Sequence, residues 1–179
     1  MSAFNTPPST LNSHLSTHLS ALSTQLLLRT DLPSGHRPIA QRHMADFHQM
    51  VRLMLSRHRI RVRKWRVSMS GCAWQVRYRN GRVIRWIEAP RPRSALSLSI
   101  FLHEIGHHVV GFDQYKRRCE EEFHVWRWAL DEMRRLKVTP DEKVLNRFDL
   151  SMRYAVGKAM RRGIKDLPKP LRQFLPEAA

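Results

Sequence analysis

The chain has 179 residues and carries 32 lysines and arginines against 15 aspartates and glutamates, for a formal net charge of +17. That length suits one domain with flexible ends, and no apolar run is long enough to cross a membrane. The charge favours contact with an anionic partner such as nucleic acid, although a well-solvated basic surface would account for it too. The two distant cysteines, Cys72 and Cys119, indicate reduced thiols rather than a disulfide framework, and we expect a cytoplasmic protein.

Residues 1–38 are rich in serine, threonine and proline and carry almost no charge, which predicts a disordered segment. Residues 39–57 repeat apolar side chains along one face, as an amphipathic helix does. Residues 60–69 then alternate in the manner of a strand, with a change of phase near Lys64. The folded part of the chain is therefore expected to begin with a helix followed by a strand.

Asn80 and Gly81 separate two further alternating runs, 73–79 and 82–88. An Asn-Gly step between such runs is typical of a β-hairpin. We therefore expect three strands, at least two of them antiparallel. The two prolines of residues 89–93 should end the strands, because proline cannot donate to the hydrogen-bond ladder.

Three helices should follow the sheet. Ser94 is expected to cap the first and Gly111 to end it, and the second runs from about 116 to 137. Thr139 is expected to cap the third, which should end near Gly163. A helix, a short and mostly antiparallel sheet and three further helices predict a small α+β domain.

The helix expected after the sheet carries the motif HExxH as His103, Glu104 and His107. On a helical wheel both histidines fall on one apolar stripe, while the opposite side is apolar as well, so this helix should lie between two layers. The spacing lets both imidazoles reach one Zn²⁺ at about 2.0–2.1 Å. Glu104 lies beside that stripe, where it could take a proton from a water that the metal activates. His108 points to the polar side and is expected on the surface.

A third ligand is expected on the next helix, which begins with three consecutive glutamates. Glu122 lies on that helix's apolar stripe, where a carboxylate is costly unless it is paired or bound to a metal. Glu120 and Glu121 point away from the stripe and are expected in solvent near the helix N-terminus, where negative charge is favoured. Asp113 is the alternative ligand, from the pattern HExxHxxGxx(H/D), but the glycine of that pattern comes one residue late, at Gly111.

The stretches "RNGRVIRWIEAPRPRSALSLSIFLHEIGHHVV" and "EEEFHVWRWAL" resemble the zincin metallopeptidases of the gluzincin type, and most of all the ImmA/IrrE-like group. The resemblance implies that His103, His107 and Glu122 bind zinc and that Glu104 is the catalytic base. The resemblance covers about residues 60–137, and we expect a zincin-like metallopeptidase domain over 39–164. The departures from the group's pattern are phenylalanine and arginine in place of two alanines, at Phe123 and Arg127.

The sequence thus predicts zinc-dependent hydrolysis of a peptide or protein substrate, which would add as an extra strand to residues 82–88 at the sheet edge. A proline-broken tail, 165–179, follows the domain. The alternative is a basic nucleic-acid-binding protein with a structural or vestigial metal site, because arginines interleave with tryptophan and tyrosine in the strands. Arg63, Arg77 and Arg85 are the contacts expected in that case. Structural zinc usually has four protein ligands, so three without an evident fourth favour catalysis.

Overall fold

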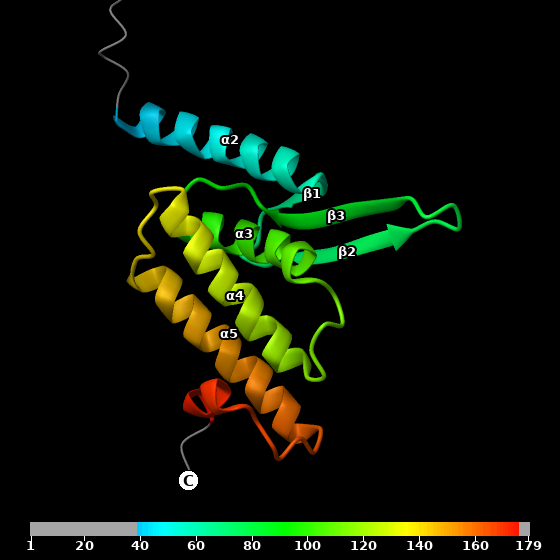
Figure 1. Cartoon of the computed structure of the whole chain (residues 1–179). Coiled ribbons are helices and arrows are strands. Elements are labelled where there is room, and N and C mark those ends of the chain that lie inside the picture. Colours follow the sequence, from blue (N-terminus) through cyan, green and yellow to red (C-terminus); the bar gives the residue numbers. More distant parts are fainter. Residues whose placement is uncertain (1–38, 176–179) are drawn as a thin grey trace, which may run out of the picture. The chain divides into compact units, whose positions relative to one another are not determined.

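The computed structural model describes residues 39–175, so the predicted disordered segment 1–38 and the last four residues lie outside the described part. The α+β class is confirmed, with the expected order of a helix, a sheet and three helices (Figure 1). The elements are α2 (Ile39–His58), β1 (Ile60–Arg66), β2 (Cys72–Arg77), β3 (Val83–Pro90), α3 (Ala95–Val110), α4 (Arg118–Arg135), α5 (Glu142–Arg161) and the 3₁₀-helix η1 (Lys169–Phe174). No helix of this described part is long and apolar enough to span a membrane.

The three strands form one sheet in the order β1-β3-β2. The predicted hairpin is confirmed, since β2 and β3 pair antiparallel on either side of Asn80 and Gly81. The change of phase near Lys64 is also confirmed, as a shift of register between Val62 and Lys64. The pairing of β1 with β3 is parallel, so the sheet has one pair of each kind and is not mostly antiparallel.

The position of β3 differs from the sequence-based expectation. Residues 82–88 were expected at the sheet edge, but β3 lies in the centre, and β1 and β2 form the two edges. The reason is that β1 and β2 do not pair with each other, and β3 enters the sheet between them. Hydrophobic alternation gives the side that each residue faces, but it carries no information on the order of the strands.

Helix α3 begins and ends at the predicted residues. Ser94 caps it by accepting a hydrogen bond from the Ser97 amide at 3.2 Å, and Gly111 ends it with a positive φ of 92°, which favours glycine. Residues 97–108 are all buried, because α3 packs against β2 and β3 on one side and α4 on the other, which confirms the prediction of two layers. The expectation of a surface position for His108 is wrong: its Nε2 lies 3.0 Å from the Trp86 carbonyl oxygen, under the sheet.

Helix α5 starts later than predicted. Asp141, not Thr139, is the cap, and its carboxylate accepts a hydrogen bond from the Val144 amide at 3.0 Å. Aspartate is a better N-cap than threonine, and Val144, whose amide it caps, has no exposed surface. The end of the helix before Gly163 agrees with the prediction.

The proline-rich segment after α5 is part of the packed structure. In η1, Leu171 and Phe174 are buried, and with Leu167 they join a cluster that includes Phe123 of α4 and Met152 of α5. Prolines at 168 and 170 disrupt the α-helical pattern in the sequence, but proline is compatible with the first turn of a helix. The core therefore extends past residue 164, into the segment expected to be a tail.

Candidate metal centre

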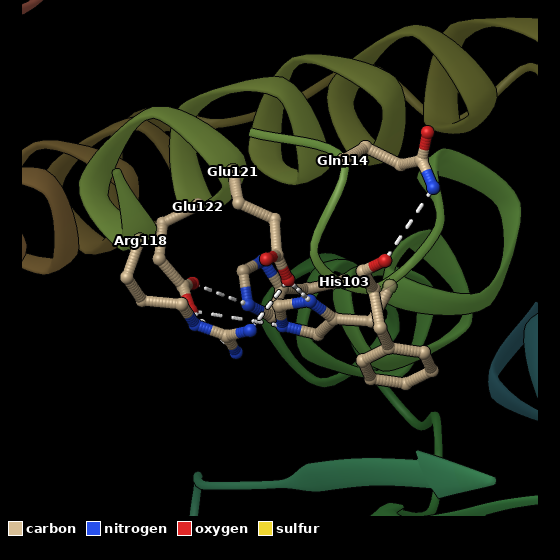
Figure 2. A network of polar contacts seen from close by, with 7 residues as sticks. His103, Gln114, Arg118, Glu121 and Glu122 are labelled. Carbon is tan, nitrogen blue, oxygen red and sulfur yellow. Dashed lines mark hydrogen bonds and ion pairs between the residues drawn. The ribbon is translucent and has the colours of Figure 1, made fainter. Parts of the chain in front are cut away.

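Helices α3 and α4 pack closely enough to bring the predicted ligands together. Gly106 lies between the two histidines, and a Cβ on it would come within 3.0 Å of a methyl carbon of Val125. The ligand atoms of His103, His107 and Glu122 all lie within 4.8 Å of one another. The Nε2 atoms of His103 and His107 lie 3.2 Å and 3.8 Å from the two carboxylate oxygens of Glu122 (Figure 2).

The protonation states of this group suit a metal ion. Burial raises the pKa of Glu122, but the hydrogen bond from His103 and the charges of the two histidines and Arg118 outweigh it, and the pKa falls to about 2. Burial and the charge of His103 lower the pKa of His107 to about 3. At neutral pH the site therefore offers an ionised carboxylate and a neutral imidazole, the forms in which these side chains bind metals.

Glu104 lies in the same cleft, next to the ligands. Its side chain is 5% exposed, and burial raises its pKa to about 7, although the charge of His103 lowers it in part. Gly71, in the loop before β2, makes room for it: a Cβ at that position would come within 2.5 Å of the Glu104 carboxylate. Glu104, which was expected beside the metal-facing stripe, thus packs against the loop that joins β1 and β2.

The cleft that contains these side chains has a volume of about 810 Å³. The start of β2 and the loop before it line this cleft, and residues of α5 line it as well. His103, Glu104, His107 and Glu122 all line it, so the four predicted site residues share one open cavity. Cys119 is buried and lines this cleft as well.

Glu121 is a residue of the site that the sequence-based reasoning assigned wrongly. It was expected in solvent, but it is 2% exposed and its Oε1 lies 3.2 Å from Nδ1 of His107, on the far side of the ring from Glu122. Arg118 reaches from the start of α4 to both carboxylates and lies 3.0 Å from Glu122 (Figure 2). Metal-binding histidines almost always donate their second ring N–H to a carboxylate, a backbone carbonyl or water, and this rule could have drawn attention to Glu121.

Asp113 does not belong to this group. It is exposed, has a φ of 59°, and lies in the loop after Gly111 has ended α3. Within the described residues, the only cluster of histidines, cysteines and carboxylates close enough to share a metal ion is His103, His107 and Glu122. The geometry thus favours Glu122 over Asp113 as the third ligand.

No protein-family model, curated protein or solved structure matches this chain. The functional inference therefore depends on the side chains of the cleft and on their arrangement. Two features of that arrangement indicate a function. Three ligand atoms converge, and a further buried carboxylate, that of Glu104, lies beside them.

Proposed function

We propose that the chain is a zinc-dependent metallopeptidase of the zincin type, which hydrolyses peptide bonds with Glu104 as the general base. The observation that carries this proposal is the convergence of His103, His107 and Glu122 on the wall of an open cleft. Catalytic zinc sites typically have three protein ligands and leave one position for water or substrate. The similarity of the HExxH and "EEEF" segments to the gluzincins agrees with it.

The donor atoms fit zinc better than calcium or magnesium. Two imidazole nitrogens and one carboxylate oxygen are a ligand set that catalytic zinc takes, whereas calcium and magnesium prefer oxygen ligands throughout. Glu121 supports the assignment, because its carboxylate lies within hydrogen-bond distance of the second ring nitrogen of His107. Such an outer contact orients the ring and raises its basicity as a ligand.

The chemistry divides between the ion and Glu104. Zinc, when bound, supplies Lewis acidity that lowers the pKa of a water molecule toward about 7. Glu104 accepts a proton from the attacking water and then delivers it to the nitrogen of the leaving amine. Among the described residues Glu104 forms no ion pair, so its carboxylate is available for this transfer.

The cleft also indicates the kind of peptide that fits. β2 is an edge strand whose first residues line the cleft, so an extended substrate can pair with it as a further strand. Four cations line the cleft without an ion pair in the described part of the chain: Lys116, Arg147, Lys158 and Arg162. We therefore propose that acidic residues are favoured beside the scissile bond. A cytoplasmic location remains part of this proposal.

The purified full chain is expected to contain about one zinc ion and to cleave members of a proteome-derived peptide library, with aspartate and glutamate enriched around the cut bonds. A chelator should abolish cleavage and added zinc should restore it. Metal analysis measures the zinc content, and mass spectrometry of the library measures the cleavage.

His107→Ala should lose the zinc, and full zinc occupancy in that variant would disprove the ligand assignment. Zinc without cleavage of any peptide would favour the alternative of a structural or vestigial metal in a nucleic-acid-binding protein.

Glu121→Gln is expected to weaken zinc binding by about 10- to 100-fold, the usual cost of losing an outer partner of a ligand. The amide keeps the volume of the carboxyl but removes the charge that orients His107 and increases its basicity. Competition with a chromophoric chelator measures the affinity. Glu120→Gln is the matched control, because Glu120 lies next in the chain and its one ion pair among the described residues is with Arg117, at 3.9 Å. Equal affinities of the two variants would contradict the role of Glu121.

A further inference from the structure

The side of the sheet that faces away from α3 carries a pair of tryptophans. Trp74 on β2 and Trp86 on β3 are direct partners across the antiparallel pair, so their side chains lie on the same side. Ala73 and Ile87 occupy the other side and belong to the core beneath α3. Neither tryptophan belongs to a buried cluster, and both are partly exposed. No helix of the described chain packs against this aromatic pair.

Arginines of β1 lie over the two rings. The Arg61 guanidinium lies 5.9 Å from the ring centre of Trp86, and that of Arg63 lies 5.8 Å from the ring centre of Trp74. Both arginines are exposed. At the tip of the hairpin, Arg82 lies over Tyr78 at 4.6 Å in the same manner. We call the surface formed by these six residues the aromatic–arginine face.

The charge of this region is of one sign. Residues 59–87 contain nine lysines and arginines and no aspartate or glutamate. The nearest acidic residue, Glu88, pairs with Arg66 at 3.1 Å and with Arg63 at 3.3 Å. Arg61 and Arg82 have no acidic partner within the described residues. Glu88 offsets only part of this charge, and an exposed surface with such an excess of positive charge attracts a polyanion.

We propose that the aromatic–arginine face binds single-stranded nucleic acid. Unpaired bases can replace the guanidinium groups of Arg61 and Arg63 over Trp86 and Trp74, and the displaced guanidinium groups can bind the phosphates. Sequence-tolerant single-strand binding proteins combine base stacking and phosphate contact in this way. A duplex hides the flat faces of its bases and leaves only its phosphates, sugars and the base edges in its grooves accessible. The two tryptophans therefore favour a single strand over a duplex, and the positive charge favours a nucleic acid over a neutral peptide.

This face is separate from the metal-binding cleft. The cleft lies between the start of β2 and helices α3, α4 and α5, whereas the aromatic–arginine face is on the outer side of the sheet. The structure also refines the contacts expected from the sequence. Arg63 lies on this face, but Arg85 shares the side of Ile87 and donates to the His58 carbonyl oxygen. Arg77 lies on the side of Ala73.

The test uses the full chain and a fluorescein-labelled oligo(dT) of about 12 nucleotides, with fluorescence anisotropy in about 50 to 200 mM salt. Wild type is expected to bind, with a loss of about 50-fold over that range if four phosphates are contacted. Trp74→Leu should weaken binding by about 5- to 100-fold, while Trp74→Phe, which keeps an aromatic ring, should retain most of it. Glu104→Gln should bind like wild type, so this result is independent of peptidase activity.

The double variant Arg61→Gln with Arg63→Gln changes only exposed side chains and tests the proposal even if Trp74→Leu does not fold. It should lower the salt slope by about 1.4. Arg52→Gln with Arg161→Gln is the matched control, since both arginines are exposed on helices and the formal charge changes equally. Equal weakening by the two pairs would overturn the proposal, as would equal binding of the matching duplex. Binding to vesicles with phosphatidylglycerol but not to oligo(dT) would overturn it too, as would self-association that Trp74→Leu abolishes.

Discussion

Glu104→Gln is expected to bind zinc like wild type and to hydrolyse peptides at least about 10²-fold more slowly, the scale of a lost general base. Glutamine keeps the volume of the side chain in a place where space is tight, against Gly71 of the loop before β2. It cannot accept the proton of the attacking water. The three ligand atoms belong to other residues, so metal affinity should not change.

The measurement compares rates on a single cleavable peptide, with metal content determined on the same samples. Glu132→Gln is the matched control, because Glu132 is also a buried glutamate, 2% exposed, but pairs with Arg57 and Arg135 away from the cleft. It should lose stability without losing the rate per folded molecule. If Glu104→Gln cleaves as fast as wild type, Glu104 is not the base and the mechanism is wrong.

The sequence was sufficient to predict α3 and the residues that it carries toward the cleft. Ser94 and Gly111 act locally, through hydrogen bonds within a turn of the helix, so their roles can be predicted from a few neighbouring residues. The same holds for the hairpin at Asn80 and Gly81 and for the change of phase near Lys64. These features depend on backbone preferences over a few residues, which do not require knowledge of the rest of the fold.

Glu121 and His108 could not be placed in this way, because their burial depends on two elements at once. A helical wheel gives the direction in which a side chain points from the helix axis. It does not give the residues of the neighbouring element that contact that side chain. Glu121 lies off the apolar stripe of α4, yet His107 of α3 lies opposite it and makes its burial possible. His108 likewise lies on the polar side of α3, where the Trp86 carbonyl oxygen accounts for its position.

Glu122→Ala is expected to weaken zinc binding by more than about 100-fold, above the cost of losing an outer partner of a ligand. The change removes one of the three converging ligand atoms and leaves the two imidazoles of His103 and His107, which alone hold zinc poorly. Asp113→Ala should leave the affinity within about twofold of wild type, since a substitution remote from the ligands removes nothing that the metal requires. Chelator competition on the three proteins measures the affinities.

These two variants decide between the two ligand patterns that the sequence left open. Both remove one carboxylate within a short stretch after α3, so a general effect of charge on metal affinity would be similar in the two. Glu122 lies 3.2 Å from His103, whereas Asp113 is exposed in the loop that follows Gly111. The opposite order of effects would require this loop to fold back onto the histidines when metal binds. The third ligand would then be Asp113, in the loop directly after α3, and not Glu122 on α4. That result would exclude the gluzincin pattern.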